Sequence, residues 1–181
     1  MNTQAAALPT SFYARDAETV AKALLGKTLV FCDKRLRIVE TEAYVGTHDL
    51  ACHASKGRTG RTEVLFGPPG RAYLYLIYGM YELFNVVTGE SGDAQGVLVR
   101  AGEPLNGITG KTDGPGKLTR ALGLTRAYNR HDLTQTPLTL TDGPAPRQIV
   151  ATTRIGVDYA GAWKDAPLRF YDPESRWVSK R

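Results

Sequence analysis

The fold is decided by residues 71–101, which read RAYLYLIYGMYELFNVVTGESGDAQGVLVRA. Aromatic and β-branched residues dominate two runs, Arg71 to Tyr78 and Tyr81 to Val87, and the intervening Gly79-Met80 suits a tight hairpin. A third run, Gly96 to Ala101, follows a turn-rich stretch. Strands that follow one another without helices between them pair antiparallel. This stretch therefore predicts part of an antiparallel sheet.

The residues before this stretch add one helix and two strands. Asp16 can cap a helix from Ala17 to Leu25, because its carboxylate can accept from free N–H groups of the first turn. Lys27 to Cys32 and Arg35 to Tyr44 have the composition of strands, and Asp33-Lys34 suits the turn between them. We expect both strands to extend the same sheet.

The residues after it add less regular structure. We expect a short helix from Gly116 to Leu122 and strands near Gln148 to Ile155 and Leu168 to Tyr171, with Pro- and Thr-rich connections between them. Residues 1–10 are expected to form a flexible tail and residues 11–181 a single domain. The pattern predicts an α+β fold: one mixed domain with a curved, mostly antiparallel sheet, a few helices and a protruding β-hairpin.

The composition of the chain excludes several classes of protein. Two cysteines in 181 residues exclude a disulfide framework and a four-cysteine zinc or iron–sulfur site built from this chain alone. Cys32 is expected to be a small buried side chain. No apolar run approaches the roughly 18 residues of a membrane span, and the first residues lack the features of a secretion signal. We therefore expect a cytoplasmic protein (nucleoid-associated if bacterial) without membrane contact.

A formal net charge of +5 favours a polyanionic partner. The loop from Val45 to Gly70 concentrates this charge, with Lys56, Arg58 and Arg61 interspersed with glycines. Such a loop can approach phosphates with side chains and backbone N–H groups. A solvated basic loop explains the segment equally well, so both interpretations stay open.

Two carboxylates lie on the second predicted strand. Alternation places two sets of side chains on opposite faces: Ile38, Glu40, Glu42 and Tyr44 on one, and Val39, Thr41 and Ala43 on the other. We expect Val39 to reach the core. The carboxylate face is then either a solvated strand face or the wall of a functional site.

The hairpin carries an unusual concentration of tyrosine. Tyr73, Tyr75, Tyr78 and Tyr81 fall within nine residues. Tyr73 and Tyr75 share a face by period two, and Tyr73 is explained by a buried core. Tyr78 lies at the turn, where burial is least available. An exposed aromatic there is typical of a protein that inserts a side chain between stacked bases.

Taken together, these segments resemble the alkyladenine (3-methyladenine, methylpurine) DNA glycosylase family. The resemblance extends from Tyr13 to Ser179 and includes Arg37–Tyr44, His53, Phe66–Gly70, Tyr73–Tyr81, Asn85, Val97–Arg100, Gly114–Leu118, Arg154–Val157, Leu168–Tyr171 and Trp177–Ser179. Matches this long and this ordered are far more specific than one short motif. The resemblance implies a monofunctional glycosylase of base excision repair, which leaves an abasic site, has no lyase activity and needs no metal or cofactor.

The resemblance also implies catalytic roles. Glu42 corresponds to the carboxylate that activates a water, and Arg100 to the arginine that holds the carboxylate and the water. An adjacent guanidinium favours the ionised carboxylate that a base needs. Ile155 corresponds to the residue whose backbone carbonyl helps to fix this water. Glu40 has no catalytic role in the family and is expected to be structural.

The remaining implied roles concern substrate binding. Tyr44 on one side, and His53 and Tyr75 on the other, correspond to residues that receive the flipped base. Asn85 corresponds to a pocket residue that disfavours the exocyclic amine of guanine, and Tyr78 to the residue that fills the gap left in the duplex.

Three basic side chains, Arg58, Arg61 and Lys117, are expected to contact DNA. Relatives often carry Thr-Pro-Arg-Asn in the basic loop, where this chain has Thr59-Gly-Arg-Thr62. Loss of the proline and the asparagine is expected to loosen this loop. This departure from the family sequence is expected to affect DNA affinity and lesion preference.

The expected partner is double-stranded DNA containing damaged purines, with no obligate protein partner and a monomeric chain. The family removes 3-methyladenine, 7-methylguanine, hypoxanthine and ethenoadenine, and the sequence does not rank these lesions. Two alternatives remain. One is a non-catalytic damage-binding protein that uses the same cleft, and the other is a glycoside hydrolase in which Glu40 and Glu42 form the acid pair.

Overall fold

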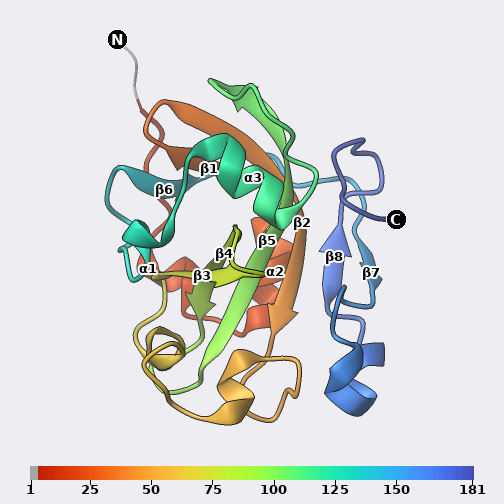
Figure 1. The fold of residues 1–181 in the computed structure, drawn as a ribbon. Coiled ribbons are helices and arrows are strands. Elements are labelled where there is room, and N and C mark those ends of the chain that lie inside the picture. The colour runs from red at the N-terminus through yellow and green to blue at the C-terminus, as the bar shows by residue number, and fades with distance from the viewer. Residues whose placement is uncertain (1–3) are drawn as a thin grey trace.

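The hairpin and the strand after it lie at one end of the sheet in the computed structural model, which describes residues 4–181 (Figure 1). Strand β3 (Ala72–Ile77) pairs antiparallel with β4 (Tyr81–Thr88), and β4 pairs with β5 (Gln95–Asn106). The sheet continues in the order β3-β4-β5-β2-β1-β6. The sequence-based prediction of antiparallel pairing in this stretch is confirmed.

Strand β2 (Lys34–Tyr44) organises the rest of the sheet. One edge of β2 pairs with β5. The other edge pairs first with β1 (Thr28–Phe31) and then, from Glu40 to Glu42, with β8 (Arg169–Tyr171). Strand β6 (Leu138–Thr141) extends the sheet beyond β1, and β7 (Val150–Thr152) pairs with β8. Figure 1 shows β7 and β8 standing beside β2, so the sheet curls around the middle of the molecule.

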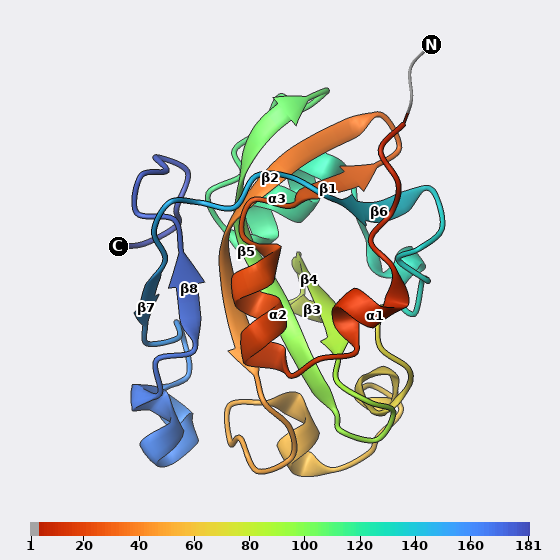
Figure 2. The same cartoon turned by 180° about the vertical axis from the view of Figure 1, so that it is seen from behind.

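Helices are few. They are α1 (Thr10–Tyr13), α2 (Ala17–Leu24), α3 (Pro115–Leu122) and the 3-10 helices η1 (His53–Lys56), η2 (Glu63–Phe66), η3 (Arg126–Tyr128) and η4 (Asp158–Asp165). Asp16 caps α2 as predicted, because its side chain accepts from the N–H of Thr19 at 2.9 Å. Figure 2 shows α2 in front of β2 and β5, on the face that carries the main core. Predicted α+β architecture and observed architecture agree.

The two faces of the sheet have different tasks. Along β5, Val97 and Val99 are fully buried in the main core, whereas Leu98 and Arg100 point to a cavity on the opposite face. Along β3, Leu74 enters the core and Tyr73 lines the cavity. Period-two alternation therefore separates a stabilising face from the face of a candidate site.

Strand β2 departs from the predicted alternation. Ile38 is in the main core, which contradicts its predicted place beside Glu42. Val39 is buried, as predicted, but outside that main core. The pairing of β2 with β5 shifts register on both sides of Glu40. A bulge inserts one residue and reverses the side-chain parity beyond it. For this reason Ala43 and Thr41 face the core, and Glu42 faces the cavity together with Tyr44.

Other boundaries also need correction. Strand β5 runs five residues beyond the predicted end at Ala101, and β6 was not predicted because its Thr-rich sequence resembles a connection. Cys32 is exposed, since it occupies the β1–β2 turn with a φ of 55°. Of the predicted tail, residues 1–3 lie outside the described residues, whereas the N–H of Leu8 donates to Leu140 at 2.7 Å. Among residues 4–181, no helix is long and apolar enough to cross a membrane.

Candidate active site

A cavity of about 910 Å³ lies on the face of the sheet opposite the main core. Strands β2, β5 and the β3–β4 hairpin form its floor, and the residues after Arg154 and the start of α3 close its sides. Ten of the predicted site residues line it: Glu42, Tyr44, His53, Arg61, Tyr75, Tyr78, Asn85, Arg100, Lys117 and Ile155. The structure therefore brings together side chains that lie far apart in the sequence.

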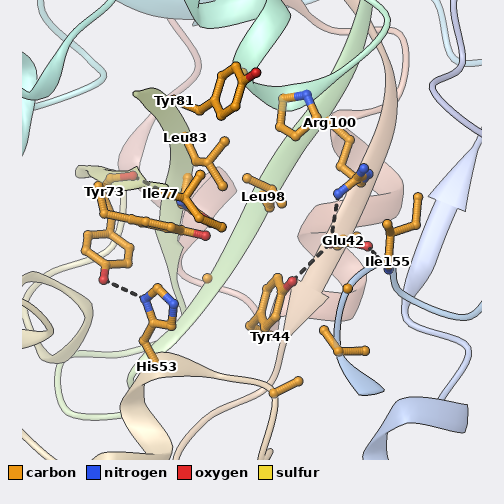
Figure 3. Close-up of a pocket in the computed structure, with 18 of the residues that line it drawn as sticks. Glu42, Tyr44, His53, Tyr73, Ile77, Tyr81, Leu83, Leu98, Arg100 and Ile155 are labelled. Carbon is orange, nitrogen blue, oxygen red and sulfur yellow. Dashed lines mark hydrogen bonds and ion pairs between the residues drawn. The ribbon is translucent and has the colours of Figure 1, made fainter. Parts of the chain in front are cut away.

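Among the residues of 4–181 that line the cavity, Glu42 is the only acidic one, and it is fully buried. One of its oxygens, Oε2, accepts from the backbone N–H of Ile155 at 2.7 Å. The other, Oε1, accepts from the hydroxyl of Tyr44 at 3.0 Å and from Nη1 of Arg100 at 3.5 Å. Figure 3 shows these three contacts converging on the carboxylate. Each carboxylate oxygen has two lone pairs, so this carboxylate can still accept from a water.

The contact made by Ile155 differs from the one expected. The resemblance implied a backbone carbonyl directed at a water, whereas the structure shows the backbone N–H of Ile155 bonded to Glu42. This N–H fixes the rotation of the carboxylate. The role of the carbonyl stays a prediction.

Burial raises the pKa of Glu42, while the guanidinium of Arg100 and the N–H of Ile155 lower it. Burial has the larger effect, because removing a charge from water costs more than these partners return. The expectation that Arg100 favours the ionised form is correct in direction. Its effect is smaller than that of burial, so the carboxylate is a stronger base than an exposed one.

Aromatic rings face Glu42 from across the cavity. The rings of His53 and Tyr75 are 4.6 Å apart, and Nδ1 of His53 lies 2.8 Å from the hydroxyl of Tyr73. Figure 3 shows His53 and Tyr73 on one side and Tyr44 on the other. Tyr73 was expected only in the core, yet it lines the cavity and orients His53. The sequence indicated this role in one way: Tyr73 lies two residues from Tyr75 on the same strand, so both side chains lie on the same face.

His53 is held in the neutral form. Burial, together with the positive charges of Arg61 and Lys56, lowers the pKa of His53 to about 4. At neutral pH this side of the cavity is therefore aromatic and carries no charge on His53. A neutral imidazole does not repel a cationic ligand.

The hairpin tip extends into solvent. Tyr78 is 84% exposed and has a φ of 53°, in the left-handed region that a bulky side chain rarely adopts. Met80 beside it is 67% exposed. An exposed aromatic held in an unfavourable backbone conformation is a mark of a functional position.

The other predicted residues are placed as follows. Asn85 is buried on β4, and its side-chain N–H donates to the carbonyl of Tyr73 at 3.2 Å. The guanidinium of Arg61 lies over the ring of Tyr75. Lys117 pairs with Asp113 at 3.3 Å at the edge of the cavity. Arg58 does not line the cavity; its guanidinium lies over the ring of Phe66.

A second buried ion pair was not predicted. Asp49 and Arg154 are fully buried and joined by two contacts of 2.6 and 2.9 Å. Asp49 also accepts from the N–H groups of Val45 and Ala51, and Arg154 lies over the ring of Tyr44. The pair thus ties the end of β2 to the segment that carries Ile155. No local sequence signal marks a pair 105 residues apart.

Glu40 is engaged outside the cavity. It is fully buried, does not line the cavity, and its oxygens accept from Arg100, Arg169 and Ser179. A carboxylate in these contacts cannot serve as the second catalytic acid of a glycoside hydrolase. Among the residues that the structure describes, no three His, Cys, Asp or Glu side chains gather as a metal site.

Comparison with known families identifies the family of this chain. A model of the family described as methylpurine-DNA glycosylase (MPG) matches residues 11–176. The chain belongs to this family. Its membership confirms the resemblance drawn from the sequence and makes the chain a DNA glycosylase of DNA repair.

Similar proteins agree with this assignment over nearly the whole chain. This glycosylase is 56% identical to a protein of Myxococcus xanthus (strain DK1622), with 96% of this chain and 93% of the relative covered. It is 52% identical to a protein of Anaeromyxobacter dehalogenans (strain 2CP-C), with 96% and 86% covered. It is 50% identical to one of Legionella pneumophila (strain Lens), with 96% and 98% covered. All three relatives carry the name "Putative 3-methyladenine DNA glycosylase".

Proposed function

We propose that this DNA glycosylase receives a flipped damaged purine in the cavity and hydrolyses its N-glycosidic bond with a water activated by Glu42. The observation that carries the proposal is the buried carboxylate of Glu42. It faces the cavity and is oriented by Ile155 on one oxygen and by Tyr44 and Arg100 on the other.

Hydrolysis of this bond requires a base and a stabilising negative charge. As the bond from the sugar carbon C1′ to the purine breaks, its electron pair leaves with the base and positive charge develops on the sugar. The oxygen of water bonds to C1′, and the carboxylate of Glu42 takes the proton of that water. The same negative charge stabilises the cationic sugar. The products are the free base and an abasic site, without cleavage of the strand.

The aromatic walls support binding of a flipped base. Tyr44 lies opposite His53 (Figure 3), and Tyr75 lies beside His53. Stacking on such rings contributes about 1–3 kcal/mol per base. A cationic methylated purine gains a further cation–π attraction. The neutral state of His53 avoids repulsion of that cation. These features favour alkylated purines such as 3-methyladenine and 7-methylguanine.

Neutral lesions belong to the same proposal. Hypoxanthine and ethenoadenine lack the positive charge, so they depend more on contacts with the ring edges. Asn85 is positioned by its bond to Tyr73 and reaches the cavity, where it disfavours the exocyclic amine of guanine.

Flipping also requires that the gap in the duplex be filled. Removing a base from the stack costs a few kcal/mol, least for damaged or mispaired bases. Tyr78 presents an exposed ring at the hairpin tip next to the cavity. Arg61, Arg58 and Lys117 supply positive charge for the phosphates near the cavity entrance.

The test is release of base from duplex oligonucleotides that carry 3-methyladenine, hypoxanthine or ethenoadenine, under single-turnover conditions. Glu42→Gln preserves the shape of the side chain but removes the base. We expect it to lower the rate by about 100- to 10,000-fold, while binding of the damaged duplex persists. Glu103→Gln is the matched control, because Glu103 pairs with Arg37 at 2.7 Å on the same strand pair and lies outside the cavity.

Each result has a defined consequence. Base release by wild type and Glu103→Gln, but not by Glu42→Gln, supports Glu42 as the base. Undiminished release by Glu42→Gln refutes it. Tight binding without release of any of the three bases by the wild type would favour a damage-binding protein instead.

A further inference from the structure

A second carboxylate shares an arginine with Glu42. Glu40 precedes Glu42 by two residues on β2 and is also fully buried. Nε of Arg100 donates to Oε1 of Glu40 at 3.2 Å, while Nη1 of the same guanidinium lies 3.5 Å from Oε1 of Glu42. A guanidinium is planar and rigid, so the contact with Glu40 determines where its other nitrogen points.

Residues 169–181 complete the surroundings of Glu40. Oε1 of Glu40 also accepts from Nη1 of Arg169 at 3.1 Å and from the hydroxyl of Ser179 at 2.8 Å. Oε2 accepts from the backbone N–H of Ser179 at 2.6 Å. Two carboxylates and two guanidiniums therefore balance in a buried cluster. A buried charge left unpaired is costly, so these side chains hold one another in place.

Arg169 connects this cluster to the second donor of Glu42. Its Nε donates to the carbonyl of Thr153 at 2.8 Å, two residues before Ile155. Its Nη1 also donates to the carbonyl of Lys180 at 2.7 Å. The N–H of Ile155 then donates to Oε2 of Glu42. Both the arginine and the backbone donor that orient Glu42 are therefore linked to the same pair, Glu40 and Arg169.

We propose that Glu40, Arg169 and Ser179 are positioning residues for the reaction, which hold Arg100 and Ile155 in the geometry that orients Glu42. The proposal rests on the proposed function, in which Glu42 is the base. It gives the segment 177–181 a task in catalysis although that segment does not line the cavity. None of the three positioning residues lines the cavity that would hold the base and the water.

The physical reason is orientation. A small misplacement of a reacting group lowers a rate steeply, by about 100-fold for 1 Å. Supporting contacts in a buried site prevent such movement, because their own side chains are fixed by packing and hydrogen bonds. A change in the network should therefore act on the chemical step and leave DNA binding largely intact.

Charge gives the network a second signature. The groups that face Glu42 are Arg100, Tyr44, Glu40 and the N–H of Ile155, with the charges or hydroxyls of Arg154, Tyr75 and Tyr159 farther off. The negative charge of Glu40 raises the pKa of Glu42. Its removal stabilises the ionised form of Glu42, so the pH below which the rate falls should move downward.

The experiment compares wild type, Glu40→Gln and Glu103→Gln in release of 3-methyladenine from methylated duplex DNA. Single-turnover rates are measured from acid to neutral pH, with the rate without enzyme subtracted, and binding of the duplex is measured in parallel. Glu40→Gln removes the charge and replaces one of the two carboxylate oxygens, each of which accepts from Ser179, with an amide NH2 that cannot accept. We expect a rate at neutral pH lower by up to about 100-fold and unchanged binding. We also expect the acid limb, the part of the pH profile in which the rate falls with falling pH, to shift to lower pH. Glu103→Gln should match wild type in all three.

Ser179→Ala provides a milder variant that retains every charge and removes only the hydroxyl contact at 2.8 Å. We expect a smaller fall in the same step, with the acid limb in place. An unchanged rate in this variant would overturn the proposal if Glu40→Gln failed to fold. A folded Glu40→Gln with an unchanged rate and acid limb would also overturn it. So would a fall in rate matched by weaker binding and lower stability with no shift of the acid limb, since that indicates a merely structural role.

The outcome for Glu42→Gln separates this proposal from the proposed function. If Glu42→Gln keeps full activity, Glu42 is not the general base, and the proposed function fails whatever Glu40→Gln shows. If Glu42→Gln loses activity while Glu40→Gln behaves like wild type, only the positioning role of Glu40 is refuted.

Discussion

The wall around Glu42 and the tip of the β3–β4 hairpin border the same cavity but are built in opposite ways. In the wall, Glu42 is buried and held by several contacts, and the buried pair of Asp49 and Arg154 supports the wall without lining the cavity. At the tip, Tyr78 is 84% exposed. Under the proposed function, this difference corresponds to two tasks of one site, catalysis in the wall and DNA recognition at the tip. A base must be fixed and partly dehydrated, whereas a side chain that enters a duplex must be free of its own protein.

The largest expected effect concerns the wall. Asp49→Ala leaves Arg154 buried without its partner and should lower the free energy of unfolding by about 3–5 kcal/mol. Glu103→Ala breaks a partly exposed pair with Arg37 and should cost about 0–1 kcal/mol. Urea denaturation monitored by circular dichroism measures both values. Equal small losses in the two variants would show that the wall is no more dependent on its ion pairs than the surface is.

A second test concerns the pH dependence of stability at His53, which lines the same cavity as Glu42 and Tyr78. Burial lowers its pKa from 6.5 to about 4. The folded state therefore disfavours the charged imidazole. The protein is most stable above pH 6.5, where the imidazole is neutral in both states, and it loses stability as the pH falls towards 4, because only the unfolded state takes up the proton. The loss should approach about 3 kcal/mol. Denaturation of wild type and His53→Asn across this range measures it. Parallel curves for the two proteins would contradict the shifted pKa.

A third test concerns the tip. Tyr78→Ala should weaken binding of a damaged duplex by about 1–3 kcal/mol, because one stacking partner is lost. Its free energy of unfolding should stay within about 0.5 kcal/mol of wild type, as expected for an exposed side chain. Fluorescence anisotropy gives the affinity and urea denaturation the stability. Marked unfolding would show that the ring of Tyr78 supports the fold, and the contrast between tip and wall would fail.

The smallest effect concerns one phosphate contact. Affinity for DNA should fall steeply with salt, and Arg58→Gln should reduce the slope of log affinity against log salt by about 1. Lys27→Gln is the control, since Lys27 pairs with Asp142 and does not line the cavity. Titrations at several salt concentrations measure the slopes. The same slope for wild type and Arg58→Gln would show that Arg58 does not contact a DNA phosphate.

Much of the fold could be predicted from local patterns. Runs of aromatic and β-branched residues in residues 71–101 predicted three strands, and the carboxylate of Asp16 marked the start of α2. Strand β6 was missed because its short Leu-Thr repeat is hidden among prolines and threonines. The parity of Ile38 was wrong, because a bulge depends on how β2 pairs with β5, which strand composition does not reveal.

By itself the sequence determined the class of fold, the exposed aromatic at the hairpin turn and the family, because these follow from short-range patterns and from the order of motifs. Tertiary structure decided that Glu40 and Glu42 are buried rather than solvated, and that Asp49 meets Arg154. It also decided that Arg169 and Ser179 reach the carboxylate of Glu40. Such contacts join residues more than a hundred positions apart, and only the closing of the sheet around β2 brings them within hydrogen-bond distance.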